Sequence, residues 1–273
     1  MRSTYLRSLG AIIVITFGMT AIIFGQSNGL PGNAQKPVEV LMDLSEQAGD
    51  TGAEMERMHQ SIFEILDPTI QEVFDLAKFI NQTEGQLDGK AHQQVLETVR
   101  GIYESFEALA QDKDKWKYEL ESTLKDVLDL LREGERHKNE YAKETEKMVQ
   151  RFRQKKAEDV PELRQEMMQM GIDLSKKRER MFTDFYDQLG EYKNFNEDVR
   201  DNIEEFLDVI EESAITTAVM VDLLEVSAQR DVILKNLNGL QHLEEYMKNI
   251  NESLQELGQA LMKLQSITDD YTS

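Results

Sequence analysis

Apolar side chains recur along most of this chain in steps of three and four residues, the spacing that gathers them on one face of an α-helix. The pattern is most regular near the C-terminus, where the run is Leu240, Leu243, Met247, Ile250, Leu254, Leu257, Leu261 and Leu264. Strict alternation of the two steps, with mostly polar residues between them, is the heptad pattern of coiled coils. The sequence therefore predicts a C-terminal helix that packs along one narrow stripe.

The same spacing extends through residues 90–273, and we predict a bundle of long helices there. No proline occurs over residues 90–158, so a single helix over this stretch would extend roughly 100 Å at 1.5 Å per residue. Breaks are predicted near Gly239 and near Pro161, where Asp159 can cap a new helix. Pro161 marks either a reversal of the chain or a kink in a continuous rod.

Residues 35–89 are predicted to form shorter helices. Gly49 and Gly52 interrupt their apolar pattern, and a helix starts or kinks at Pro68, because Asp67 can cap it and proline suits the first helical position. Together these expectations give an all-α fold, an elongated antiparallel helical bundle or coiled coil. Narrow stripes bury little area per residue, so self-association would supply further burial.

The N-terminal segment, residues 1–34, has a different character. Between Arg7 and Lys36 there is no charged residue, and residues 8–25 give 18 uncharged positions, at the short end of the roughly 17–25 that span a bilayer. Because arginines precede this segment, the positive-inside rule predicts a cytoplasmic N-terminus and an exported remainder. We predict a cytoplasmic stub, a single transmembrane helix and a short linker. A cleaved signal peptide, cut near Ala34, is the alternative and would release a secreted protein.

Acidic side chains dominate the composition. The chain has 52 Asp and Glu against 31 Lys and Arg, a net charge of −21, which disfavours nucleic acid as a partner because affinity for it comes largely from neutralising phosphates. There is no cysteine, which excludes disulfides, thiolate metal sites and cysteine nucleophiles.

Catalytic motifs are absent from the sequence. It contains no His-Glu-x-x-His, no Gly-x-Ser-x-Gly, no phosphate-binding loop and no dinucleotide fingerprint. Glu56 and His59 have the Glu-x-x-His spacing of di-iron bundles, but no second pair completes such a site, and we expect both on an exposed helix face. The uncharged residues 213–221, SAITTAVMV, predict a helix buried on two sides, with a membrane-inserting tip as the alternative. We therefore predict no catalytic, cofactor-binding or metal-binding residues, and no enzyme.

Charge is unevenly distributed along the chain. The net charge is −12 over residues 36–142, zero over residues 143–200 and −11 over residues 201–273. The neutral region holds the basic residues Arg151, Arg153, Lys155, Lys156 and Arg164, on both sides of Pro161. One interpretation is pairing with neighbouring Glu and Asp on the helix surface. The other is contact with an anionic surface or an acidic partner.

These observations predict a membrane-anchored, exported coiled-coil protein that acts as a structural spacer, scaffold or assembly partner without enzymatic activity. Its expected partners are the membrane, through the N-terminal segment, and another protein or a second copy, through the helix stripes. The alternative hypothesis is a membrane-active helical protein, either pore-forming or membrane-shaping in the manner of BAR domains, which bind lipid with a basic face.

Overall fold

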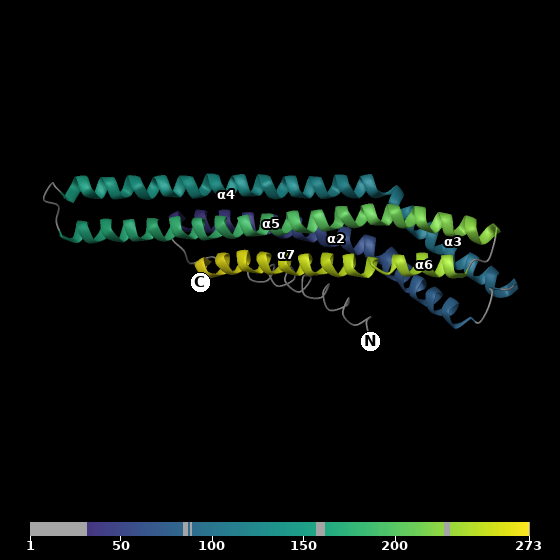
Figure 1. The fold of residues 1–273 in the computed structure, drawn as a ribbon. Coiled ribbons are helices and arrows are strands. Elements are labelled where there is room, and N and C mark those ends of the chain that lie inside the picture. Colours follow the sequence, from purple (N-terminus) through teal and green to yellow (C-terminus); the bar gives the residue numbers. More distant parts are fainter. Residues whose placement is uncertain (1–31, 84–86, 88, 157–161, 227–229, 273) are drawn as a thin grey trace. The chain divides into compact units, whose positions relative to one another are not determined.

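The computed structural model describes residues 32–83, 87, 89–156, 162–226 and 230–272. The described helices are α2 (Gly32–Gln82), α3 (Gly89–Gln111), α4 (Lys113–Lys156), α5 (Glu162–Val226), α6 (Arg230–Leu240) and α7 (Leu243–Thr272) (Figure 1). Within these ranges there is no strand and the helices pack as a bundle. The all-α prediction is confirmed.

Helix α2 is continuous, and the prediction of shorter helices over residues 35–89 is wrong. It has 51 residues and passes through Gly49, Gly52 and Pro68, so no new helix starts at the proline. Its buried side chains keep steps of three and four on both sides of these residues, so one uninterrupted stripe stabilises the helix. Proline has no backbone N–H, so the Glu64 carbonyl, four residues before Pro68, has no helical hydrogen-bond donor. Both residues lie on the exposed face of α2.

The single helix considered for residues 90–158 is interrupted once among the described residues, at Asp112 between α3 and α4. Asp112 N still donates to the Ala108 carbonyl at 3.3 Å, and the Asp112 carbonyl accepts from Trp116 N at 3.0 Å. The interruption is therefore local. A second short interruption, at Gln241 and His242 between α6 and α7, follows the predicted break near Gly239.

The chain reverses between α4 and α5. Pro161 itself lies outside the described residues, but the contacts on both sides of it run in opposite directions. The Tyr141 ring stacks on Phe182 with centroids 4.3 Å apart, and Thr145 Oγ1, further along α4, donates to the Ser175 carbonyl, further back on α5, at 3.2 Å. The two helices form an antiparallel hairpin, and the kinked rod is excluded.

The described residues fall into two compact units. The first unit contains residues 32–53, 124–156, 162–196 and 256–272, so it is built from parts of α2, α4, α5 and α7. The second unit contains residues 54–83, 87, 89–123, 197–226 and 230–255, so it holds α3, α6 and the remaining parts of α2, α4, α5 and α7. Each unit has its own buried apolar core.

Two helix ends in the second unit are satisfied by side chains from other helices. Arg230, at the start of α6, donates through Nε to the Ile80 carbonyl (3.1 Å) and through Nη2 to the Asn81 carbonyl (3.2 Å), near the end of α2. The Nε2 atom of His92 lies 2.8 Å from the Leu224 carbonyl in the last turns of α5. Neither α2 nor α5 has a basic residue in its own last turn. These contacts supply partners that terminal carbonyls require.

Candidate functional site

The α4–α5 hairpin extends beyond the other helices of the first unit. Helix α7 contacts α5 as far as Lys177, whose Nζ lies 5.6 Å from the centroid of the Tyr271 ring. Past this level α4 and α5 continue as a pair, beyond the described turns of α2 and α7 (Figure 1). We call residues 145–156 of α4 and 162–175 of α5 the hairpin end.

Small and polar residues hold the two helices of the hairpin end together. Thr145 and Ser175 are both buried, and their hydroxyl oxygens lie 3.2 Å apart. Gly171 provides room for Met148, because a Cβ added to the glycine would lie 3.3 Å from the Met148 Cε atom. In the hairpin end α4 covers one side of α5. No helix among the described residues covers the side of α5 that faces away from α4.

Three apolar side chains occupy that uncovered side of α5. Met167, Met170 and Leu174 are 65%, 70% and 48% exposed, and we call them the Met stripe. Helical spacing places them on the same face as Met181 and Phe185, which are buried further along α5. The Met stripe is therefore the continuation of a core face past the point where its partner helices end.

The apolar spacing that predicts a bundle over residues 90–273 also includes the Met stripe, yet these three side chains are exposed. The spacing of Met167, Met170 and Leu174 is identical to that of the buried residues that follow. No local signal distinguishes them, because exposure here depends on where α2 and α7 end.

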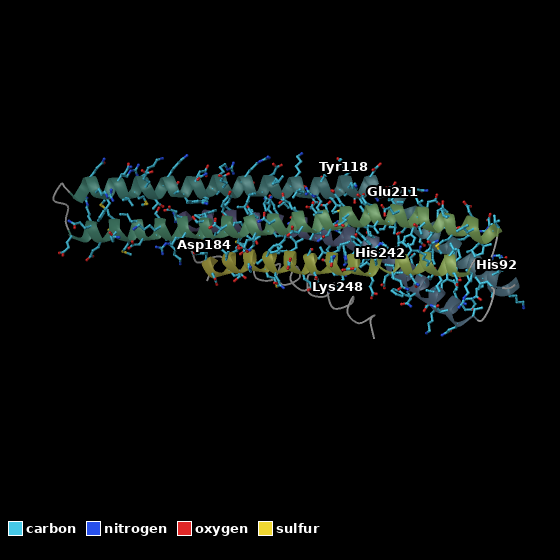
Figure 2. All side chains as sticks on the ribbon, in the orientation of Figure 1. His92, Tyr118, Asp184, Glu211, His242 and Lys248 are labelled. Carbon is cyan, nitrogen blue, oxygen red and sulfur yellow. The ribbon has the colours of Figure 1, made fainter. Side chains whose placement is uncertain are left out.

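The basic residues predicted as a contact site lie on the hairpin end. Arg151, Arg153 and Arg164 are exposed, and the structure shows none of the three in an ion pair with another described side chain. Lys155 and Lys156 belong to the last turn of α4, but their side chains lie outside the described part of the chain. Arg164 is one helical turn from Met167, so a guanidinium adjoins the Met stripe. Side chains project to solvent all along this hairpin (Figure 2).

The uncharged residues 213–221 are covered on one side only, so the expectation of burial on two sides is wrong. Ser213 and Thr217 are buried and donate hydrogen bonds to backbone carbonyls one turn back. Ile215 and Val219 on the other face are 62% and 48% exposed. This part of α5 is an ordinary amphipathic helix in the second unit.

His59 is buried, which corrects its predicted place on an exposed face. Its ring contacts the Phe63 ring in a tilted arrangement with centroids 3.9 Å apart, and its side chain hydrogen-bonds Asn251. Burial lowers the pKa of His59 to about 4, although the hydrogen bond opposes the shift. Its Nε2 atom has no hydrogen-bond partner among the residues that the structure describes. Glu56 instead accepts from Gln60 Nε2 at 3.3 Å, and no group of three potential metal ligands is found among the described residues.

A cavity of about 300 Å³ lies in the second unit, between α5 and the turn that joins α6 to α7. Its polar lining includes Glu212, Lys235 and His242. The His242 ring contacts the Gly239 carbonyl through Nδ1, which fixes the ring at the end of α6.

In the part of the chain that the structure describes, no helix is both long enough and apolar enough to cross a bilayer. The predicted anchor, residues 8–25, lies outside that part. Comparison with protein-family models, with curated proteins and with solved structures finds no match to this chain.

Proposed function

We propose that this chain is an exported, membrane-anchored helical protein that acts as a spacer or scaffold and carries no chemistry of its own. The observation that supports this most directly is helix length. Helix α5 has 65 residues and α2 has 51, far above the mean of about 11–12 residues for an α-helix. Long helices that pack along narrow apolar stripes are typical of coiled-coil spacers and scaffolds.

Further support comes from the narrow buried stripes of these helices. They leave broad polar faces and an overall acidic surface, which favours an elongated antiparallel bundle or coiled coil that meets protein partners or a second copy. The apolar residues 8–25 would attach this bundle to the membrane from its exported side.

Extraction of membranes at alkaline pH tests the anchor. We expect the full chain to remain with the membrane pellet and its exported part to be accessible to added protease. Replacing Ile15→Arg, at the centre of the apolar segment, should release the protein, because a central arginine costs about 2.5–3.5 kcal/mol of insertion free energy. Ser27→Arg, outside the segment, is the matched control and should stay anchored.

A mature N-terminus at Gln35 by mass spectrometry would overturn the anchor in favour of a secreted protein. The spacer role is tested separately by small-angle scattering of the purified chain. Its radius of gyration should be clearly above the roughly 19 Å of a globule of this length. A value near 19 Å would exclude a spacer.

A further inference from the structure

We propose that the hairpin end is a lipid-docking surface, which lies on the anionic surface of the same membrane that holds the N-terminal segment. The proposal rests on the proposed anchoring and adds a second point of attachment to it. In this arrangement the Met stripe enters the headgroup region while Arg151, Arg153 and Arg164 contact phosphates.

The apolar contribution comes from the Met stripe. Met167 and Met170 are among the most exposed large apolar side chains of the described residues, and with Leu174 they form one continuous strip on a helix face. A helix with apolar residues on one face and cations beside them lies in the plane of the lipid interface, with its apolar side buried about 5–10 Å. Methionine side chains adapt well to such an irregular environment.

The electrostatic contribution comes from a local reversal of charge. Residues 143–180 carry eleven basic and eight acidic side chains, a net charge of +3, in a chain whose total is −21. The Debye length at physiological salt is about 8 Å, so acidic residues elsewhere on the first unit offset these cations weakly. Basic residues near an anionic bilayer add to the binding free energy, and their contribution falls as salt rises.

The position of the chain's N-terminal end brings a membrane within reach of the hairpin end. In the first unit, the described part of α2 begins on the side from which the hairpin end projects (Figure 1). The seven residue steps from Gly25 to Gly32 span at most about 25 Å. From Lys177 to Glu162 the hairpin end extends about 22 Å along α5 at 1.5 Å per residue. The two lengths are similar, so a bilayer that the chain leaves at Gly25 lies within reach of the hairpin end.

Lipid fits both parts of this surface better than the protein alternatives do. An acidic face of a second copy would match the arginines and leave the Met stripe uncovered. The chain's own residues 8–25 would match the Met stripe and leave the arginines without anions. An anionic bilayer supplies phosphates and an apolar interior at once.

The absence of cysteine allows a direct test. A single Met170→Cys variant of the full chain is labelled with an environment-sensitive dye and reconstituted into vesicles. One set contains phosphatidylcholine alone and the other contains phosphatidylglycerol in addition. We expect a blue shift of the dye, and quenching by lipid-borne quenchers, in the anionic vesicles alone. Tyr118→Cys, at a position 72% exposed on the second-unit part of α4, is the control and should show neither (Figure 2).

A charge variant then tests the arginines. Arg151→Gln, Arg153→Gln and Arg164→Gln together should abolish the blue shift in anionic vesicles while helicity by circular dichroism is unchanged. Arg132→Gln with Arg136→Gln is the matched control, because both arginines are exposed on the first-unit part of α4 and pair with Asp129 and Glu133 of their own helix. This control should keep the shift.

Alkaline extraction of the same samples separates the two proposals. An anchored protein with no shift in either vesicle set overturns lipid docking and leaves the anchor intact. An equal shift in neutral vesicles or in detergent means that a second copy or residues 8–25 cover the Met stripe, which also overturns it. A protein released by alkali refutes the anchor, and a shift confined to anionic vesicles would still support docking.

Discussion

Tyr192 links α5 to α2 inside the first unit through its hydroxyl group. The side chain is fully buried, and Oη donates to the Ala48 carbonyl at 2.7 Å and lies 2.8 Å from Thr51 Oγ1. Gly52 makes the approach possible, since a Cβ there would lie 3.2 Å from the same Oη. Burial raises the pKa of Tyr192 to about 12, so the phenol stays neutral at every physiological pH.

Tyr192→Phe should lower the free energy of unfolding by about 1 kcal/mol, the usual net value of a buried hydrogen bond. The cost stays modest because Thr51 Oγ1 also donates to the Ala48 carbonyl, at 2.9 Å, which keeps that acceptor paired. Urea unfolding measures the change. In a Thr51→Val background the same substitution should cost more, because the carbonyl then loses both of its side-chain donors. Equal costs in the two backgrounds would contradict the shared network.

His59 gives the second unit a dependence on pH. Its pKa in the folded chain is about 4 against 6.5 for an unperturbed histidine, so between these values the unfolded state binds a proton that the folded state does not. The stability associated with neutral His59 is therefore complete above pH 6.5 and is lost as the pH falls toward 4.

Replacing His59→Gln should flatten the decline in unfolding free energy between pH 6.5 and pH 4. At 1.36 kcal/mol per pKa unit, the wild-type chain loses at most about 3 kcal/mol more than the variant over this range. Urea unfolding at several pH values measures the free energy of unfolding of both chains. The titration of carboxylates contributes equally to both and cancels in the difference. Parallel curves for wild type and His59→Gln would show that His59 already titrates normally.

At the scale of elements, glycines set how closely the hairpin helices approach. A Cβ at Gly134 of α4 would lie 3.2 Å from the Leu189 Cδ2 atom and 3.7 Å from the Tyr186 Cδ2 atom, both on α5. A Cβ at Gly190, in the same unit, would meet no atom of the described residues within 4 Å. Both glycines lie within α-helices, Gly134 in α4 and Gly190 in α5, but only Gly134 has close neighbours.

Gly134→Val should therefore destabilise the first unit by about 1–3 kcal/mol, because Leu189 is fully buried and has little room to move. Gly190→Val, the control for the helix propensity of valine, should change stability by a few tenths of a kcal/mol. Thermal unfolding monitored by circular dichroism measures both. Similar effects at the two positions would mean that α4 and α5 are not closely packed at Gly134.

At the scale of the whole molecule, net charge opposes folding. The chain carries −21, whereas its ion pairs between helices, such as Lys113 with Asp208 at 2.9 Å, involve partly or fully exposed side chains. Exposed pairs contribute about 0–1 kcal/mol each. General repulsion between acidic side chains should therefore exceed the attraction within these pairs.

Raising NaCl from 10 mM to 300 mM should thus increase the melting temperature at pH 7, because the Debye length falls from about 30 Å to below 8 Å. The same salt series near pH 4.6, where the net charge vanishes, is the control and should show a much smaller effect. A melting temperature that falls with salt at pH 7 would mean that ion pairs outweigh the repulsion.

The helical character of this protein and the stripe of α7 could be predicted from the sequence alone. Both depend on the spacing of apolar residues within one segment, which is a local property of the chain. The sequence also located the exposed arginines of the hairpin end, since charge runs are visible without a fold. The interruption between α6 and α7 follows from the same kind of local signal, a glycine after an amphipathic run.

Which apolar residues are covered, and where the chain turns, depends on how the helices pack against one another. Gly52 and Pro68 lie within one helix because an unbroken buried stripe on either side outweighs their weak helix propensity. The reversal between α4 and α5 is fixed by partners such as Tyr141 and Phe182, 41 positions apart. Met170 and Phe185 have the same pattern around them, but one is exposed and the other is buried. Burial depends on what lies across the interface, and spacing along a single helix contains no information about that neighbour.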